Sequence, residues 1–187
     1  MHETEKDNFV EACKTQVNEF YSDLKYNPDY TSVINQKHYD RLNGLLSDAK
    51  DHGAELVEIN PANEDFSQQE SHKIPPTLVL NPTDEMQIMK EEIFGPLLPI
   101  KTYKDINEPI NYINKNDKPL GLYYFGSNKN EEAKVVNSTT SGGVTVNDIM
   151  GHIQQNELGF GGVGPSGMGK YDGFDGFMNF SNNKPIY

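Results

Sequence analysis

The residues best suited to chemistry in this chain are Glu92 and Phe94, which lie just before Gly95 and Pro96. A carboxylate can accept two hydrogen bonds from neighbouring hydroxyl groups, and an aromatic ring offers a flat stacking surface. Gly95 permits backbone angles that a Cβ atom would resist, and Pro96 fixes the next φ. Such a turn can hold both side chains at a cleft, where they would suit the ribose and base of a nucleotide. The alternative is a helix end with solvated acids.

The elements that must position this turn alternate between helices and strands. Apolar residues spaced three and four apart predict an amphipathic helix wherever the pattern persists, and short apolar runs bounded by Pro, Gly or Asn predict strands. Helices are predicted at 7–24, 36–51, 106–114, 130–137 and 170–177, with a capped helical turn at 84–89 and a polar, exposed loop at 61–73. Strands are predicted at 56–59, 77–80, 97–103, 120–125, 143–147 and, as a final edge strand, 180–187. This alternation predicts an α/β fold, a largely parallel open sheet flanked by helices, with no repeat and no interdomain linker.

Composition narrows the classes of partner. The 187 residues include 16 basic and 28 acidic side chains, a net charge of −12, without a basic block. This charge disfavours nucleic acid and anionic membranes as partners. No apolar run approaches a membrane-spanning length, and the first residues show no signal-peptide pattern. With a single cysteine, which excludes an intrachain disulfide, a cytoplasmic location is expected.

Several constellations that could carry other chemistry fail on context. Cys13 lies in the apolar stripe of the first predicted helix, where a small buried residue is a better interpretation than a thiolate. The five histidines are scattered without a Cys partner, so no metal site is predicted. Two phosphate-loop patterns occur, from Gly159 to Gly164 and from Gly164 to Lys170. The first lacks a good preceding strand, and the second has Tyr171 where a Mg²⁺-binding hydroxyl is needed.

The segment Glu91-Glu92-Ile93-Phe94-Gly95-Pro96 also resembles the signature of the aldehyde dehydrogenase superfamily. The resemblance extends through Pro119 to Leu122, Ser141 to Asp148 and Phe160 to Gly169, in the family's order. The last of these looks most like the class 3 and coniferyl aldehyde dehydrogenase branch, apart from Gly159 where Pro is usual.

This resemblance implies a cofactor, NAD or NADP, with Glu92 on the nicotinamide ribose and Phe94 near the nicotinamide. It implies that the glycine-rich loop is close-packed and borders a substrate tunnel. Phe160, Asn147 and His152 are the tunnel candidates. Each also has a structural alternative: an apolar packing residue for Phe160, a turn cap for Asn147, and a surface or packed histidine for His152.

The family's cysteine nucleophile, glutamate base, oxyanion asparagine and cofactor-binding domain occur in segments that this sequence does not contain. We therefore assign no catalytic residue, and Cys13 does not match the nucleophile. We expect residues 1–178 to be part of an aldehyde dehydrogenase catalytic domain and 179–187 to be an oligomerisation strand. The parent enzyme would oxidise aldehydes, the coniferyl-like branch suggesting aromatic or medium-chain apolar ones. The truncated chain alone would be inactive, would not bind the cofactor, and would leave apolar surface uncovered. The alternatives are a folded module that self-associates, as a homodimer for example, or binds a full-length relative, and a P-loop nucleotide binder.

Overall fold

The computed structural model describes residues 1–187, which form two compact units, Met1–Tyr103 and Lys104–Tyr187. The sequence did not indicate this division. None of the helices is long and apolar enough to cross a membrane.

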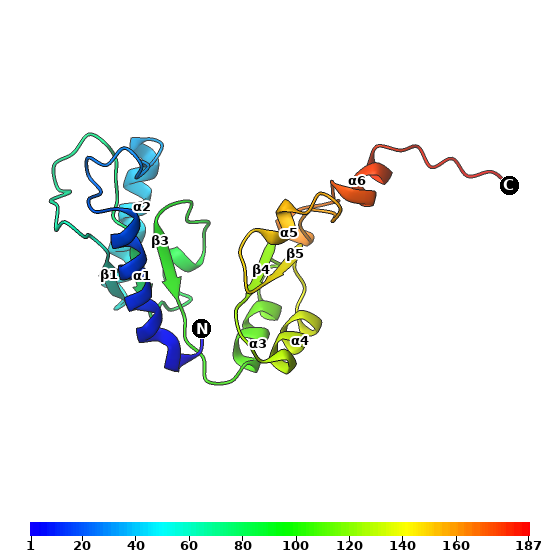
Figure 1. Cartoon of the computed structure of the whole chain (residues 1–187), viewed down its shortest axis with the longest axis horizontal. Helices are drawn as coiled ribbons and strands as arrows, with labels where there is room; N and C mark the ends of the chain where they lie inside the picture. The colour runs from blue at the N-terminus through cyan, green and yellow to red at the C-terminus, as the bar shows by residue number, and fades with distance from the viewer. The chain divides into compact units, whose positions relative to one another are not determined.

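The first unit places two long helices beside a three-stranded sheet (Figure 1). The sheet has the order β1 (Glu55–Glu58), β2 (Thr77–Leu80), β3 (Leu97–Ile100), in which β1 is antiparallel to β2 and β2 is parallel to β3. The elements of this unit are η1 (Glu3–Glu5), α1 (Lys6–Phe20), α2 (Gln36–Asp51), β1 (Glu55–Glu58), β2 (Thr77–Leu80), η2 (Gln87–Met89) and β3 (Leu97–Ile100).

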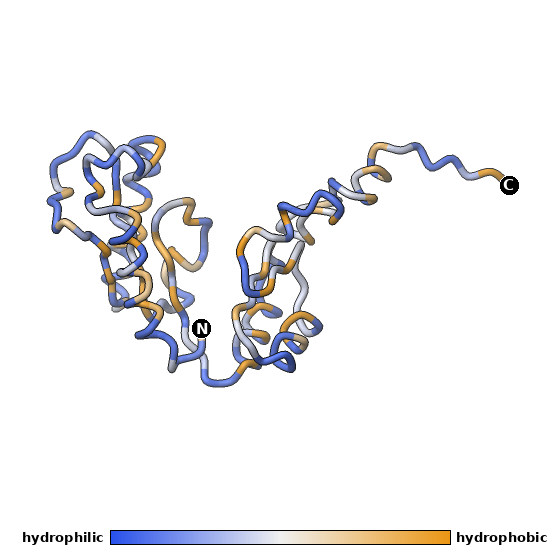
Figure 2. The backbone as a smooth tube through the Cα atoms, in the orientation of Figure 1, coloured by the Kyte–Doolittle hydropathy of each residue, from blue (hydrophilic) through white to orange (hydrophobic).

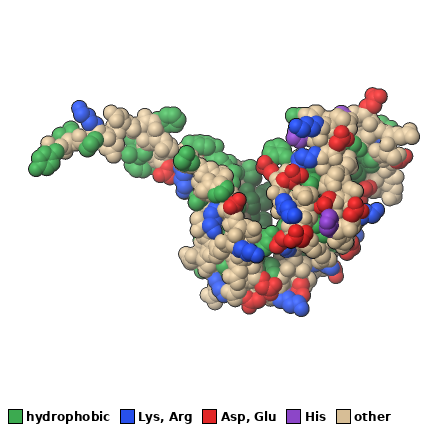
Figure 3. Space-filling view, turned by 180° about the vertical axis from the view of Figure 1, so that it is seen from behind, with side chains coloured by type: hydrophobic (Ala, Val, Ile, Leu, Met, Phe, Trp, Pro, Cys, Tyr) green, Lys and Arg blue, Asp and Glu red, His purple; other side chains and the backbone are tan.

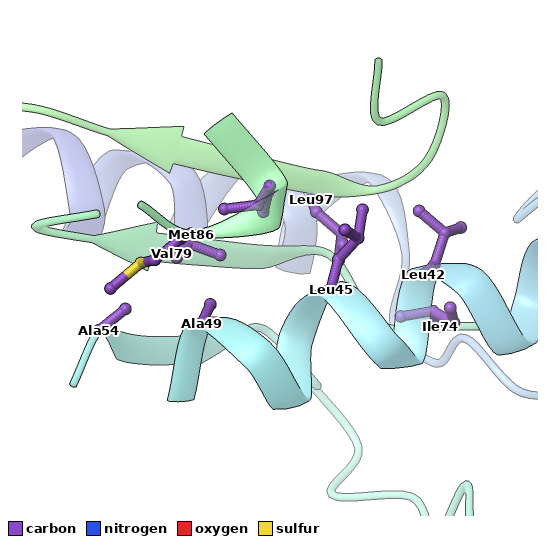
Figure 4. Packing of buried hydrophobic residues seen from close by; sticks show 9 residues of the cluster. Leu42, Leu45, Ala49, Ala54, Ile74, Val79, Met86 and Leu97 are labelled. Atoms are coloured by element: carbon purple, nitrogen blue, oxygen red, sulfur yellow. The ribbon is translucent and has the colours of Figure 1, made fainter. Parts of the chain in front are cut away.

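Helix α2 occupies the predicted range because local signals define both of its ends. The side chain of Asn35 accepts a hydrogen bond from the His38 amide at 3.0 Å, which caps the N-terminus. Gly53 follows the C-terminus with a φ of +89°, a conformation that glycine adopts without penalty. Leu42, Leu45 and Ala49 project from α2 toward Val79 of β2 and the other core residues of the unit (Figure 4).

The predicted first helix is four residues too long. Helix α1 ends at Phe20, and Leu24 lies beyond it, fully buried. The carboxylate of Glu64 accepts the amide hydrogens of Leu24 and Lys25, at 2.6 and 3.0 Å, which a longer helix would have directed to its own carbonyls. Two tertiary hydrogen bonds therefore replace the last helical turn.

The second unit is built on a β-α-β crossover. Strands β4 (Gly121–Tyr124) and β5 (Gly143–Val146) pair in parallel, and α4 (Lys129–Ser138) connects them. Ile110 of α3, Tyr124 of β4 and Val135 of α4 form its small core. The elements are α3 (Asn107–Lys115), β4 (Gly121–Tyr124), α4 (Lys129–Ser138), β5 (Gly143–Val146), α5 (Gly151–Gln154), η3 (Gly164–Ser166) and α6 (Gly173–Asn179).

Two of the three strand pairings are parallel, so the predicted α/β class with mainly parallel pairing is confirmed. The antiparallel pairing of β1 and the distribution of the strands over two sheets were not predicted. The predicted edge strand at 180–187 is absent from this single chain, where the segment after α6 runs as coil (Figure 1). Hydrophobic residues lie at both ends of that coil, around polar residues at its middle (Figure 2). Whether it pairs with a second chain stays a prediction.

Candidate functional site

The loop that precedes β3 presents Glu92 and Phe94 at the surface of the first unit. Both side chains are exposed, and Phe94 is 84% exposed despite its large apolar ring. Phe94 has a φ of +48°, in the left-handed region that non-glycine residues rarely adopt. A strained backbone that displays an apolar ring to solvent is characteristic of functional sites rather than of packing.

Arg41 of α2 holds this loop by hydrogen bonds to its main chain. Its Nη1 donates to the carbonyl oxygen of Glu92 at 3.0 Å, and its Nη2 donates to that of Ile93. The carboxylate of Glu91 lies 3.6 Å from Nη1. The planar guanidinium thereby fixes two successive peptide groups. The carboxylate of Glu92 makes no side-chain hydrogen bond or ion pair within the chain, so it is available to hydroxyl groups of a ligand.

Gly95 lets the loop approach α2 closely. A Cβ atom at this position would lie 2.5 and 2.7 Å from the two Cδ atoms of Leu42, which is fully buried. The next residue, Pro96, accepts the amide hydrogen of Thr77 at 2.9 Å, which starts the pairing of β2 with β3. The Gly-Pro pair therefore joins the exposed loop directly to the core of the unit.

Phe94 lines a groove of about 670 Å³ within the first unit. One wall is residues 94–96 and the other is residues 30–34, with Tyr21 and His38 completing the lining. Tyr21 and Tyr30 pack edge to face with ring centroids 5.1 Å apart. The groove is mainly apolar and aromatic, and it can accept a planar ring beside Phe94. Glu92 lies next to this groove in sequence but does not line it.

His152 is enclosed in the second unit rather than displayed. It is 8% exposed, its Nδ1 lies 2.7 Å from Oγ1 of Thr145, and its main-chain amide donates to the same oxygen at 3.0 Å. The other ring nitrogen, Nε2, is buried without a partner. A Cβ atom at Gly143 would lie 2.3 Å from Cδ2 of His152, so this glycine makes room for the ring. The structure therefore favours the packed-histidine alternative.

Phe160 stacks on His152, with ring centroids 6.3 Å apart and an angle of 29° between the planes. Its main chain exchanges two hydrogen bonds with Tyr171, at 2.7 and 2.9 Å. The structure thus brings Phe160 and His152 together. Asn147 lies apart from this stack. Its side-chain amide accepts from Gly126 N at 2.8 Å and donates to Gly126 O at 3.0 Å, so it is bonded to the segment after β4 rather than to the turn that follows Asn147.

The glycine-rich segment is close-packed, as predicted. A Cβ atom at Gly161 would lie 2.1 Å from the carbonyl oxygen of Gly169, and one at Gly162 would lie 2.2 Å from main-chain atoms of Ser166. The segment contains only the three-residue helix η3, the element before it is α5 rather than a strand, and the helix predicted at 170–177 begins at Gly173. It therefore lacks the strand-loop-helix context of either phosphate-binding motif.

Neither Cys13 nor the histidines form a reactive or metal-binding centre. Burial raises the pKa of the Cys13 thiol, which packs against a core cluster of the first unit, so the reactive thiolate is disfavoured. No group of three or more His, Cys, Asp or Glu side chains is arranged to hold a metal ion.

Sequence reasoning missed Arg41, Tyr21 and Tyr30. Arg41 is the sole arginine among the 187 residues and lies on the same helix as Leu42, a signal that could have drawn attention to it. Tyr30 had no such signal, because its role depends on a fold that brings 30–34 to the side of residues 94–96.

Comparison with known proteins bears on the family and the fold. Residues 1–186 match the profile described as the aldehyde dehydrogenase family. A probable coniferyl aldehyde dehydrogenase of Caulobacter vibrioides is 53% identical over 179 residues, and the coniferyl aldehyde dehydrogenase of a Pseudomonas species is 48% identical over 180. Each match covers 96% of this chain and 37% of the relative. The solved substrate-bound state of Staphylococcus aureus AldH superposes with a TM-score of 0.83 at 37% identity, covering 100% of this chain and 41% of that one.

The chain belongs to the aldehyde dehydrogenase family. It spans little more than a third of the length of the curated relatives it matches.

Proposed function

We propose that this chain contributes to an enzyme that oxidises aldehydes to carboxylic acids with NAD or NADP. In this proposal Glu92 accepts hydrogen bonds from ribose hydroxyls, and Phe94 and the groove beside it receive the nicotinamide end. The bound cofactor would supply the hydride acceptor. The observation that carries the proposal is Phe94, an exposed ring held at a φ of +48° beside an aromatic groove, on a loop fastened by Arg41.

The proposed substrate is coniferyl aldehyde or another aromatic aldehyde. Support comes from the names of the two relatives at 53% and 48% identity. In the second unit, Phe160 is half-buried and stacked on His152, so one ring can form an apolar wall while the other backs it. Asn147 would act there through its two hydrogen bonds to Gly126.

We further propose that the 187-residue chain by itself has no aldehyde dehydrogenase activity. Its single thiol, Cys13, packs on a core cluster with a raised pKa, and no other cysteine is present in the sequence. Covalent aldehyde oxidation needs an accessible thiolate.

A chimera tests the family activity. The upstream part of the Caulobacter vibrioides relative is joined to this chain, and coniferyl aldehyde-dependent NADH formation is followed by absorbance. We expect activity in the chimera, none in this chain alone, and a loss of at least about tenfold in kcat/KM for Glu92→Gln, a change worth 1.4 kcal/mol. The exposed Glu70→Gln is the matched control. A folded chimera without activity on any aldehyde would refute the proposal.

A second candidate function is self-association. The net charge of −12 opposes contact between copies, but residues 158–187 contain two lysines and two aspartates and are therefore neutral. Phe174, Phe177 and Phe180 are exposed there, and hydrophobic side chains stand out along this segment (Figure 3). We propose that residues 179–187 pair with a second copy as an oligomerisation strand. Light scattering tests this idea, since a monomer at high concentration would remove it.

The single free cysteine fits a reducing compartment such as the cytoplasm.

A further inference from the structure

Lys73 is a buried cation that lies outside the proposed cofactor site. Its side chain is almost fully enclosed, and its Nζ donates to the carbonyl oxygens of Leu24 and Asn27, at 3.0 and 2.6 Å. Two main-chain carbonyls, rather than a carboxylate, therefore meet its charge. A buried ammonium group is costly unless it is well hydrogen-bonded, so this geometry constrains the turn that supplies the carbonyls.

Glu64 holds the same turn from its amide side. Its carboxylate accepts the amide hydrogens of Leu24 at 2.6 Å and of Lys25 at 3.0 Å. Hydrogen bonds to charged groups are stronger than those between neutral groups. Glu64 and Lys73 both lie in the loop that was predicted to be polar and exposed. Glu64 thus bonds the amides of this turn, and Lys73 bonds its carbonyls.

This turn leads directly into the groove wall that faces Phe94. The amide of Tyr30 donates to the carbonyl of Asn27, at 3.3 Å, and the Tyr30 hydroxyl donates to the carbonyl of Ile74, the residue after Lys73, at 2.6 Å. Further along the wall, the amide of Val33 donates to the carbonyl of His72 at 3.0 Å. Residues 64–74 are therefore hydrogen-bonded to residues 24–33 at five positions, Leu24, Lys25, Asn27, Tyr30 and Val33.

We propose that Lys73 and Glu64 are positioning residues that hold wall 30–34 of the groove in place before any ligand arrives. The consequence for cofactor binding rests on the proposed function. If the wall is already ordered, the free energy of binding does not include the entropy cost of ordering it. Removing either charge therefore raises the concentration of cofactor needed for half-saturation. Neither residue touches the cofactor or the reacting atoms in this proposal.

The first test uses the 187-residue chain and amide hydrogen exchange. Lys73→Met keeps a long apolar side chain and removes the cation, and Lys50→Met makes the same change on the exposed surface of α2. In Lys73→Met we expect the amides of Leu24, Tyr30 and Val33 to exchange at least about tenfold faster than in the natural chain. In Lys50→Met their exchange rates should be unchanged. The amide of Val79 in the core should be unaffected in both variants. Unchanged exchange at Tyr30 and Val33 in Lys73→Met would overturn the proposal.

Glu64→Gln keeps the proposal testable if Lys73→Met does not fold. It retains one acceptor oxygen but no charge, and Glu70→Gln in the same loop is its control. We expect faster exchange at Leu24 and Lys25 that spreads to Tyr30. Exchange that accelerates at Leu24 and Lys25 alone would show that the turn does not control the wall.

The second test uses the chimera and separates KM from kcat. A variant that merely destabilises the protein lowers the amount of active enzyme, and so lowers the apparent kcat without changing KM for the cofactor. A displaced wall raises that KM, by about tenfold for the loss of an interaction worth 1.4 kcal/mol, with little change in kcat. An unchanged KM in Lys73→Met and Glu64→Gln would overturn the positioning role. If the unmodified chimera is inactive, the proposed function fails, and the exchange experiment still decides whether Lys73 and Glu64 hold the wall.

Discussion

Nη1 of Arg41 lies 3.0 Å from the carbonyl oxygen of Glu92, and this bond ties the exposed loop of the first unit to α2. The helix that buries Leu42, Leu45 and Ala49 in the core thus also controls the main chain next to Phe94. Stability and the geometry of the candidate site are therefore coupled through one side chain.

We expect Arg41→Lys to lower the free energy of unfolding by about 1–2 kcal/mol, because an ammonium cannot span both carbonyls in the plane that the guanidinium occupies. Urea denaturation measures this change. Arg41→Met, which makes neither bond, should lose more. Equal stability of Arg41→Lys and the natural chain would show that the bonds contribute nothing.

Gly95→Ala should destabilise the chain by about 1–3 kcal/mol, because its Cβ atom would lie within 2.7 Å of both Cδ atoms of the buried Leu42. The control is Gly44→Ala in α2, where nothing lies within 4 Å of the added atom and helix propensity predicts a gain of about 0.5–1 kcal/mol. Combining Gly95→Ala with Leu42→Ala should cost less than the sum of the single changes. Strict additivity would contradict the proposed clash.

Phe94→Gly should stabilise the chain, by about 1 kcal/mol, because a φ of +48° is strained for Phe and free for Gly, and the exposed ring contributes little packing. The same change should reduce the activity of the chimera. Phe94→Ala separates the two effects, since it removes the ring but retains the strain. Thermal unfolding and NADH formation are the measurements, and a destabilised Phe94→Gly would show that the ring is a packing residue.

Thr145→Val should destabilise the second unit by about 1–3 kcal/mol. The hydroxyl meets both the main-chain amide and Nδ1 of His152, and its loss leaves these buried groups unpaired beside an Nε2 that already lacks a partner. Thr140→Val on the exposed surface is the control. NMR shifts of the His152 ring should change in Thr145→Val alone; identical shifts in the two variants would argue against the pairing.

Tyr30→Phe should alter the stability at alkaline pH. Burial, with a smaller contribution from Tyr21, raises the pKa of Tyr30 far above its ordinary value. The folded chain therefore holds this proton more tightly than the unfolded chain, a contribution that is complete below about pH 10 and is lost as pH rises toward the raised pKa.

Tyr30→Phe should cost about 1–2 kcal/mol at neutral pH, where the bond to Ile74 is lost, and its stability should fall less steeply than that of the natural chain above pH 10. Urea denaturation across this pH range measures both effects. The exposed Tyr26→Phe is the control, and parallel pH curves for Tyr30→Phe and the natural chain would contradict the assignment.

Local signals in the sequence were sufficient for most elements. Asn35 and Gly53 mark the ends of α2, and the apolar run bounded by prolines marks β2, because capping and strand burial act over a few residues. The Glu92 and Phe94 turn was predicted to place both side chains at a cleft. Both are exposed, but only Phe94 lines the groove, and a role for Glu92 stays a prediction. Local signals failed where a distant partner intervened, as at the end of α1, where Glu64 takes amides that the helix would have used.

The loop at 61–73 also shows that local sequence does not reveal distant partners. Its polar composition predicted exposure, and composition carries no information about which polar groups meet. In the structure, Lys73 is buried because carbonyls from a segment nearly fifty residues earlier surround its ammonium group.

The sequence alone determined the family resemblance and the α/β class, and it singled out Glu92 and Phe94 as candidate cofactor-binding residues. All three depend on residue type and short-range spacing. Only the tertiary structure decided that Arg41 bonds the main chain of the loop, that residues 30–34 form a groove wall, and that His152 is enclosed. Each depends on hydrogen bonds or packing between side chains and a main chain brought near by the fold, and no spacing along a sequence encodes which atoms those will be.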